Sequence, residues 1–448
     1  MAYSQYWNPK NETLPRVQLQ ALQLHKLKRL TEWAYANVPF HRKRWEAAGF
    51  HPDQLTTLDD IRRIPYMSRE EWMESQIELP LFGDLLATDQ TNAIRYHLTS
   101  GTTGRTPIRV LDGMKDWEWI AEMWCYGFWA FGVRPEDTVY FAFGYGSFIG
   151  FWGAHYCCEK IGALVIPGGA QTTEGRVKQI VEMGVTTVCS TPTYALRLWQ
   201  AAREMGIELA NDSKVTKLIV SGEPAGSIPG VKRQLEQAWG AKVGDTAGMT
   251  EIGTIMIFEC SHQPGGTHII EDHFIEETIE PVADRPARYG ERGERVVTSF
   301  GRGFIPLIRY RTKDLVVKQP YTRCTCGRTG DLYEGGIQGR WDDMKLIRGT
   351  NVYARAVEAI VREYDAIDEF QIYIDHPDLQ DEITIRFEIK PNVVVNVEQL
   401  ERALCQDLAD AHEGLRFNVR QEEYGTLPRF ELKAKRLVDV RPVAQYVQ

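Results

Sequence analysis

The sequence contains no apolar run of the roughly 18 residues that a membrane-spanning helix needs. The nearest candidate, residues 141–158, is interrupted by four glycines and by His155. The first residues, Met-Ala-Tyr-Ser-Gln-Tyr-Trp, also lack the basic and apolar segments of a secretory signal. We therefore expect a soluble, cytoplasmic protein that does not enter a membrane.

The sequence also has fewer basic than acidic residues and few cysteines. Lysine and arginine number 52 against 61 aspartates and glutamates, which gives a formal net charge of -9. This balance argues against a nucleic-acid-binding surface. It leaves small anionic ligands open, because these need only a local positive potential. Eight cysteines in 448 residues do not suggest a disulfide framework.

The length of the chain and its alternating pattern predict an α/β protein with two domains. A chain of 448 residues is too long for one compact core. After a helical region over residues 1–90, strand and helix patterns alternate from about 110 to 240, which indicates a mostly parallel sheet flanked by helices. Ligands bind such sheets beyond the carboxyl ends of the strands. Here those ends lead into residues 221–224 and 245–251.

The last hundred residues predict a small α+β domain with its own core. Apolar residues alternate over 370–374 and 383–389, as in half-buried strands. Asn396 caps a predicted helix, with Gln399 three residues further on. We therefore predict a large N-terminal domain over residues 1–341, with mixed or parallel sheets, and a small mobile domain over 342–448.

Residues 99–107 are rich in hydroxyls and glycine: Thr99, Ser100, Gly101, Thr102, Thr103, Gly104, Arg105, Thr106 and Pro107. Glycine lets the backbone fold closely around a ligand, and free N–H groups with hydroxyls form a cradle for an anion such as phosphate. The run differs from the phosphate loop that ends in Lys-Ser/Thr. An ordinary surface loop explains the composition equally well.

Four further runs bear on that choice. Residues 245–251 end in Thr250 and Glu251, which suit a phosphate oxygen and a magnesium ion. Residues 309–315 contain Asp314, whose carboxylate could take two ribose hydroxyls. Residues 339–352 cross the predicted domain boundary, and residues 429–436 are basic. Each run alone is explained by a cap, a turn or a solvated face, but five in this order are improbable by chance.

Together these runs resemble the signature of the acyl-adenylate-forming superfamily, and most closely its phenylacetate–CoA ligase branch. The resemblance extends over nearly the whole chain from about residue 5. It includes Gly222-Glu223-Pro224 and the runs 143–148, 153–156, 271–274 and 433–436.

The resemblance implies a role for each matching residue. Ser100, Thr102 and Thr103, in the loop with Gly101 and Gly104, would hold the β,γ-phosphates of ATP. Glu223 and Pro224 would line the adenine pocket, and Asp245 would join the ATP site. Thr250 would contact the α-phosphate, Glu251 would bind the magnesium, and Asp314 with Arg340 would bind the ribose. Asp342 would be the hinge, Lys433 would be the catalytic lysine, and Gly349 would lie beside the CoA path.

Three departures from the family pattern accompany these roles. Ala247 stands where an aromatic residue usually stacks on adenine, and Arg105-Thr106-Pro107 replaces a Lys-Pro pair. Leu432 stands where a glycine usually precedes the catalytic lysine, so Lys435 remains the alternative to Lys433.

A second group of residues predicts a structural zinc site. Cys324 and Cys326 are one residue apart and could chelate one ion, which Cys260 and a histidine would complete as a tetrahedral Cys₃His site. Some relatives in the same branch carry a histidine at the position of His268, which favours it over His262. The alternative is a group of buried, reduced thiols, as we expect for the remaining cysteines.

The acyl pocket is predicted from aromatic and small residues. Tyr145, Phe148, Phe151 and Trp152 cluster in the sequence, and an aromatic acid would stack well among them. Ala225 and Gly248, with Gly222 and Gly226, would leave room beside them. A well-packed core is the alternative.

The sequence therefore predicts an aryl- or arylacetyl-CoA ligase that uses ATP, Mg²⁺ and CoA. A carboxylate would attack the α-phosphate of ATP to give acyl-AMP and pyrophosphate, and the CoA thiol would then attack the acyl carbonyl. One alternative is an adenylate-forming enzyme with another acceptor, such as an amine, a carrier protein or a cofactor. The other is a non-catalytic nucleotide-binding protein. A homodimer is left open.

Overall fold

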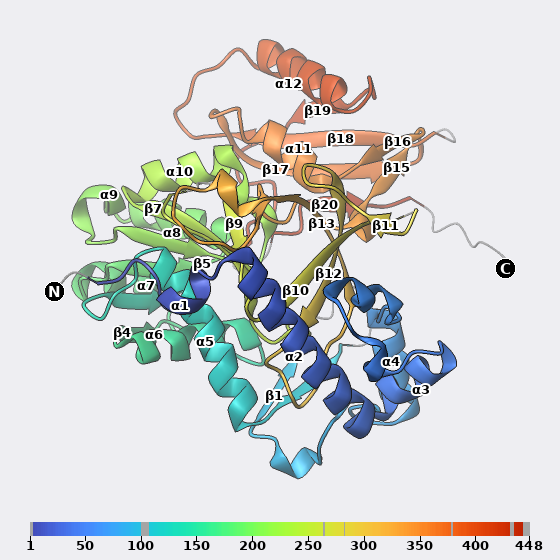
Figure 1. Ribbon diagram of the computed structural model, residues 1–448. Helices are drawn as coiled ribbons and strands as arrows, with labels where there is room; N and C mark the ends of the chain where they lie inside the picture. The colour runs from blue at the N-terminus through green and yellow to red at the C-terminus, as the bar shows by residue number, and fades with distance from the viewer. Residues whose placement is uncertain are drawn as a thin grey trace.

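The chain is described by a computed structural model for residues 3–99, 107–262, 265–281, 283–377, 380–430 and 434–441 (Figure 1). A central sheet of 12 strands dominates it, with the strand order β11-β10-β12-β13-β14-β9-β8-β7-β6-β5-β3-β4. Within the described residues, no helix is both long and apolar enough to span a bilayer.

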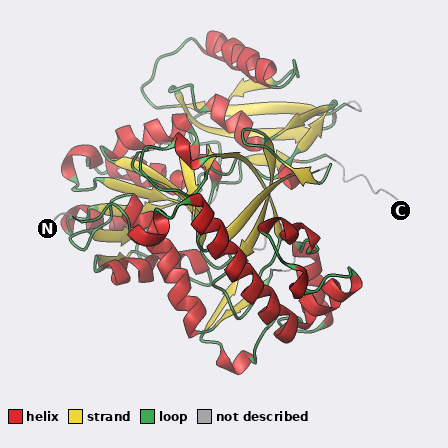
Figure 2. Cartoon of the chain, viewed as in Figure 1, coloured by secondary structure: helices red, strands yellow, loops and turns green. Residues whose placement is uncertain are grey.

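One half of this sheet is parallel and alternates with helices, as the sequence predicts. Its strands are β3 (Thr138–Phe141), β4 (Leu164–Pro167), β5 (Thr187–Ser190), β6 (Lys217–Val220) and β7 (Lys242–Gly248). The helices between them are α6 (Ile149–Ile161), α7 (Thr173–Glu182), α8 (Pro192–Glu204), α9 (Leu209–Asp212) and α10 (Pro229–Trp239). Figure 2 shows these helices packed beside the parallel strands.

The other half of the sheet is antiparallel from the β7–β8 pair onward. It consists of β8 (Ile255–Glu259), β9 (Gly266–Ile269), β14 (Leu332–Glu334), β13 (Tyr310–Gln319), β12 (Arg292–Ser299), β10 (Phe274–Glu280) and β11 (Arg285–Pro286). The sequence pattern also predicts a strand over residues 306–310, but β13 begins only at Tyr310. The reason is Arg309, whose φ of 50° lies outside the extended region.

The first hundred residues are mostly helical, as predicted, and lie along the antiparallel half of the sheet (Figure 1). The helices are α1 (Pro9–Glu12), α2 (Arg16–Asn37), α3 (Pro39–Ala47) and α4 (Arg69–Glu78), followed by the hairpin β1 (Arg95–Leu98) and β2 (Arg109–Asp112). Ser68 begins α4 with a capping box to Glu71.

Short 3₁₀ turns occur along the described chain at Pro52–Gln54, Leu58–Arg63, Gln90–Asn92, Pro224–Ser227, Tyr321–Arg323 and Trp341–Asp343.

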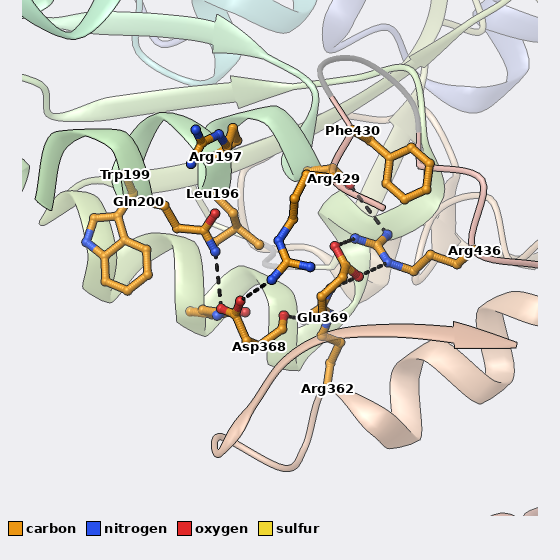
Figure 3. Close-up of a pocket in the computed structure, with 12 residues that line it drawn as sticks. Leu196, Arg197, Trp199, Gln200, Arg362, Asp368, Glu369, Arg429, Phe430 and Arg436 are labelled. Carbon is orange, nitrogen blue, oxygen red and sulfur yellow. Dashed lines mark hydrogen bonds and ion pairs between the residues drawn. The ribbon is translucent and has the colours of Figure 1, made fainter. Parts of the chain in front are cut away.

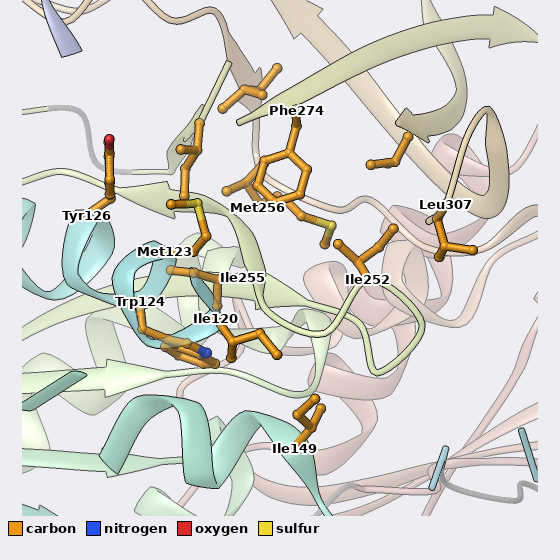
Figure 4. Close-up of a cluster of buried hydrophobic side chains, with 14 of the residues drawn as sticks. Ile120, Met123, Trp124, Tyr126, Ile149, Ile252, Ile255, Met256, Phe274 and Leu307 are labelled. Atoms are coloured by element: carbon orange, nitrogen blue, oxygen red, sulfur yellow. The ribbon is translucent and has the colours of Figure 1, made fainter. Parts of the chain in front are cut away.

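The main hydrophobic core lies where α5 (Met114–Ala130) packs on the sheet. In Figure 4, Met123 and Ile120 of α5 lie close to Ile255, and Phe274 lies near Met256. All five side chains are buried. Burial of one such side chain contributes about 1.5–3 kcal/mol, so this contact fixes α5 against β8, the strand that follows Thr250 and Glu251.

The C-terminal region forms a small unit with its own core, at the top of Figure 1. Its sheet has the order β19 (Asn418–Gln421), β18 (Glu382–Ile389), β17 (Ile367–Asp375), β20 (Leu437–Asp439), and it is accompanied by α11 (Ala354–Val361), α12 (Val397–Ala411) and the hairpin β15 (Lys345–Ile347) with β16 (Thr350–Val352). The predicted cap of α12 is confirmed, because Asn396 Oδ1 accepts from Gln399 N at 3.1 Å. The boundary at residue 341 itself stays a prediction.

Two glycines on α6 provide a test of the packing between α5 and α6. A Cβ on Gly153 would lie 2.5 Å from Nε1 of the buried Trp124, whereas one on Gly150 would lie 3.6 Å from the same indole. We expect Gly153→Ala to destabilise the protein by about 1–3 kcal/mol through overpacking. Gly150→Ala is the matched control, and it should be neutral or stabilising by up to about 1 kcal/mol through helix propensity. Thermal denaturation measures both, and equal midpoints would contradict the packing described.

Candidate functional site

The predicted site residues gather where the parallel strands end. Glu223 follows β6, Asp245 lies in β7, and Thr250 and Glu251 follow β7. Other predicted residues lie outside the described residues: Ser100, Gly101, Thr102, Thr103, Gly104, Arg105 and Lys433, together with the side chains of Pro224, Ala225 and Asp342.

The turn that carries Thr250 and Glu251 is fixed by the buried side chain of Arg302. The Arg302 guanidinium donates to both carboxylate oxygens of Asp112, at 2.7 and 2.8 Å. Its Nη1 also donates to the main-chain oxygens of Thr250 at 3.0 Å and of Glu251 at 2.7 Å. The pair between Arg302 and Asp112 therefore sets where the turn points. Sequence reasoning missed Arg302, which stands alone between two glycines and belongs to no recognisable motif.

The Glu251 carboxylate is buried and interacts with Arg69, which sequence reasoning also missed. Arg69 Nη1 donates to Glu251 Oε1 at 2.7 Å, and Arg69 Nη2 donates to Thr99 Oγ1 at 3.2 Å. Tyr310 adds a longer contact of 3.5 Å to the same carboxylate oxygen. Arg69 thus connects Glu251 to the residue that precedes the predicted phosphate loop. A buried carboxylate beside that loop suits a hard cation such as Mg²⁺.

Asp314 and Arg340 are brought together, as the sequence predicts. The two residues form an isolated β-bridge. Arg340 Nη1 lies 3.8 Å from Asp314 Oδ1, and Arg295 Nη1 lies 3.7 Å from Asp314 Oδ2. Burial raises the pKa of Asp314 to about 6, against the opposing effect of these two arginines. A carboxylate in this position can accept hydrogen bonds from vicinal hydroxyls.

Asp245 lies buried in β7 beside a second carboxylate. Its main-chain N–H donates to Glu259 Oε2 at 2.9 Å, and Glu259 pairs with Lys232. Burial, and then the negative charge of Glu259, raise the pKa of Asp245 to about 8. Asp245 is therefore mostly protonated at neutral pH, so that it can donate a hydrogen bond as well as accept one.

Glu223 accepts hydrogen bonds from two main-chain N–H groups. Thr193 N, in α8, donates to Glu223 Oε1 at 2.7 Å. Ala434 N, which precedes β20 in the small unit, donates to Glu223 Oε2 at 3.0 Å. Burial raises the pKa of Glu223, and the hydrogen bond from Thr193 opposes that shift. Both oxygens of the carboxylate are therefore engaged by the protein itself.

The aromatic residues predicted for the acyl pocket form one connected cluster. The ring of Phe151 is stacked on Phe148, with centroids 5.2 Å apart, and also on Phe143. Tyr145 contacts Trp152 at 4.8 Å and shares a hydrogen bond of 2.8 Å with His155 Nδ1. Gly248 adjoins Thr254, whose carbonyl oxygen would lie 2.5 Å from a Cβ. Only a residue without a side chain fits there.

The predicted cysteines and one histidine converge on a single point. One ligand atom from each of Cys260, His268, Cys324 and Cys326 lies within 4.8 Å of all the others, and all four residues are buried. The two Sγ atoms of Cys260 and Cys324 are 3.6 Å apart, and Cys326 Sγ is 3.4 Å from His268 Nε2. These distances approach the edges of about 3.6–3.8 Å expected of a tetrahedron with Zn–S bonds of about 2.3 Å.

The histidine in this group is His268, whereas His262 is exposed and lies outside it. His268 Nδ1 lies 3.4 Å from the carbonyl oxygen of Gly330, which leaves Nε2 facing the sulfurs. Hydrogen bonds from Cys260 and His268 lower the pKa of the Cys326 thiol, and the thiolate is the form that binds a metal. The donor set therefore fits zinc.

Between the large and small units lies a small cavity with a charged lining, shown in Figure 3. Gln200 of α8 donates to Asp368 at 3.1 Å. Arg436 lies buried beside it and binds Glu369 through Nε at 2.7 Å and Nη2 at 3.2 Å. The sequence places Arg436 in a basic run that a solvent-exposed face would also explain, whereas the structure buries Arg436 among acidic side chains.

A family model for the AMP-binding enzyme C-terminal domain matches residues 349–441. Among curated proteins, the chain is similar to phenylacetate-coenzyme A ligase of Thermus thermophilus. The two are 33% identical over 97% of this chain and 99% of the relative.

Among solved structures, the chain is similar to two crystal structures of 2-hydroxyisobutyryl-CoA ligase. One, in the postadenylation state with 2-HIB-AMP, has a TM-score of 0.92 at 31% identity and covers 98% of this chain and 93% of that chain. The other, in complex with 2-HIB-AMP and CoA in the thioesterification state, has a TM-score of 0.74 at 32% identity with the same coverage.

The raised pKa of Asp245 predicts a specific effect of pH on stability. In the unfolded chain Asp245 loses its proton near pH 4, whereas in the folded protein it keeps it until about pH 8. Unfolding between these values releases a proton, so this residue lowers stability as pH rises towards 8. Asp245→Asn should therefore raise the melting temperature, by more at pH 8 than at pH 5.5.

Thermal denaturation of the nucleotide-free protein over this pH range measures the effect, with Asp59→Asn as control, because Asp59 is exposed and its partner is Arg62. A gain that does not change with pH would show that the carboxyl group of Asp245 titrates normally.

Proposed function

The chain belongs to the phenylacetate–coenzyme A ligase family, and from this premise we propose that it joins an aromatic or arylacetic acid to coenzyme A. It is an AMP-forming acyl-CoA ligase of the acyl-adenylate-forming superfamily. Such an enzyme first converts a carboxylate and ATP into acyl-AMP and pyrophosphate. It then transfers the acyl group to the thiol of coenzyme A and releases AMP.

The aromatic cluster of Tyr145, Phe148, Phe151 and Trp152 carries the proposal for the acid. Flat rings at 4.8–5.2 Å from one another offer faces and edges on which an aromatic ring can stack. Gly248, in β7, and Ala225 are the small residues that we expect to leave room beside these rings. This combination favours a planar ring over a short branched chain, whose few methyl groups would leave much of such a surface without contact.

We assign the adenylation half-reaction to a set of residues around the strand ends. Thr250 would contact the α-phosphate of ATP, and Glu251, held by Arg69, would hold the Mg²⁺ that neutralises phosphate charge. Asp314 with Arg340 would bind the ribose, and residues 100–104 the β,γ-phosphates. Asp245 would contribute a polar contact to the nucleotide. Lys433 would stabilise the charge that develops as the carboxylate attacks.

We propose that the small domain, residues 342–448, turns about Asp342 between the two half-reactions. The two structures of 2-hydroxyisobutyryl-CoA ligase support this: identity and coverage are nearly equal, yet the TM-score falls from 0.92 in the postadenylation state to 0.74 in the thioesterification state. We attribute the drop to a changed arrangement of the domains, because the relative is the same enzyme in both structures. Gly349, at the β15–β16 turn, would then lie beside the path of coenzyme A.

We also propose a structural zinc ion bound by Cys260, His268, Cys324 and Cys326. Four protein ligands leave no open position for a substrate, so the ion would stabilise the fold without taking part in the reaction. Its site connects distant parts of the chain. Gln5 and Tyr6 both donate to the carbonyl oxygen of Cys326, at 3.3 and 2.9 Å.

The choice of acid is tested by a pyrophosphate-release screen with ATP, Mg²⁺ and coenzyme A present. We expect the highest kcat/KM with phenylacetate or another aromatic acid, because ring stacking is available only to these. Acetate and 2-hydroxyisobutyrate are the matched aliphatic acids. A higher kcat/KM for 2-hydroxyisobutyrate would contradict the aromatic proposal, and release of pyrophosphate without dependence on coenzyme A would point to another acceptor.

The zinc site is tested by elemental analysis of the purified protein. We expect about one zinc per chain in the wild type and little in a Cys324→Ser/Cys326→Ser variant, which should also have a lower melting temperature, because loss of a structural metal removes folding free energy. Cys405→Ser, which alters a thiol of the small domain far from the site, is the control. Absence of zinc from the purified wild-type protein would refute the proposed site.

A further inference from the structure

The contact of Glu223 with Ala434 joins the two parts of the chain that the adenylation half-reaction must bring together. Glu223 belongs to the turn after β6, at the carboxyl ends of the parallel strands. Ala434 belongs to the C-terminal unit and directly follows Lys433 in the sequence. The hydrogen bond from Ala434 N to Glu223 Oε2 is 3.0 Å long and spans 211 positions of the chain.

The other oxygen of Glu223 holds the carboxylate in place. Thr193 N, in the first turn of α8, donates to Oε1 at 2.7 Å. A carboxylate at a helix N-terminus is stabilised by the free N–H groups there. With one oxygen held by α8, the other is presented in a fixed direction to Ala434. A hydrogen bond to a charged acceptor is also stronger than one between neutral groups.

A second contact keeps the same segment in register. Arg436, two residues after Ala434, is buried and pairs with Glu369 and Glu358 of the small unit. Its Nη1 also reaches Thr193 Oγ1 at 3.5 Å. Thr193 therefore contacts both Glu223 and Arg436, so residues 434–436 meet the large unit where the first turn of α8 adjoins the turn after β6.

We propose that Glu223 is a positioning residue for adenylation, which holds the main chain at Ala434 so that Lys433 is presented to the reacting carboxylate. This inference rests on the role proposed above for Lys433. It gives the carboxylate of Glu223 a role other than adenine recognition, because both of its oxygens accept hydrogen bonds from the protein's own main chain. If the small domain turns after adenylation, the contact serves one half-reaction only.

The two possible roles of Glu223 make different predictions for the half-reactions. ATP and acyl-AMP both carry adenine, so a residue that recognises adenine should affect both half-reactions. A residue that positions Lys433 should affect only the first. Glu223→Gln preserves size and shape but removes the charge and one of the two acceptor oxygens, so it weakens the contact with Ala434.

The first measurement compares the half-reactions of Glu223→Gln in the full-length protein. ATP–pyrophosphate exchange with the best acid reports adenylation, and thioester formation from synthetic acyl-AMP and coenzyme A reports the second step. We expect exchange to fall by about 10- to 100-fold, with a fall of less than about twofold in the second step. Equal losses in both steps would overturn the inference.

The second measurement is a double-mutant cycle with Lys433→Ala, followed by the same exchange reaction over long incubations. Once the Lys433 side chain is absent, holding its segment in place no longer speeds adenylation. Glu223→Gln should therefore lower the rate of exchange by less than about a further twofold. Losses that multiply would show that Glu223 acts independently of Lys433, and would overturn the inference. Full exchange by Lys433→Ala alone would instead refute the proposed role of the lysine.

A control removes a different contact between the same two units. Arg233 and Glu363 form an exposed ion pair of 2.6 Å between α10 and the small unit. Arg233→Gln should change ATP–pyrophosphate exchange by less than about twofold, because an exposed pair contributes little. A loss equal to that of Glu223→Gln would mean that any weakened contact between the units slows adenylation, which would overturn the specific role of Glu223. Thermal denaturation of each variant verifies that it is folded.

Discussion

The ion pair between Arg302 and Asp112 is the interaction on which the candidate site most depends. Both side chains are almost completely buried, so neither charge could remain there without the other. Because the same guanidinium also binds the carbonyl oxygens of Thr250 and Glu251, one charged group joins the β1–β2 hairpin to the turn after β7. Removal of one partner from such a pair typically costs about 3–5 kcal/mol. The direction of Thr250 and Glu251 is therefore set by an arginine that would itself contact neither the phosphate nor the metal ion.

The elements of the fold were largely predictable, because local patterns determine them. The alternation over β3 to β7 and the cap at Asn396 follow from periodicity and side-chain chemistry, which depend on neighbouring residues. The convergence of His268 with three cysteines also agreed with the predicted spacing. Arg69 and Arg302 could not be found in the same way, since the carboxylate that each arginine binds lies 182 or 190 positions away and no local pattern records such a pairing.

Several polar pairs join the two units, and such pairs suit the domain movement that we propose. Hydrogen bonds and an ion pair cross this contact, from Gln200 to Asp368, from Arg436 to Thr193 and between Arg233 and Glu363. An apolar contact would strongly favour one arrangement, because separating it exposes hydrophobic area to water. Charged groups regain hydration when they separate, so the free-energy difference between two arrangements can stay small.

The contacts of Gln5 and Tyr6 with Cys326 have a consequence for synthesis on the ribosome. These two residues emerge well before their partner, which follows 321 and 320 positions later. The segment with Gln5 and Tyr6 therefore lacks these contacts until about 320 further residues have been translated. At about 5–20 residues per second this takes roughly 15–65 seconds. Tyr3 and Trp7 gain their aromatic partner earlier, because Trp129 is translated well before Cys326. Early folding around Trp129 would keep this segment close to the nascent large domain before the cysteine turn exists.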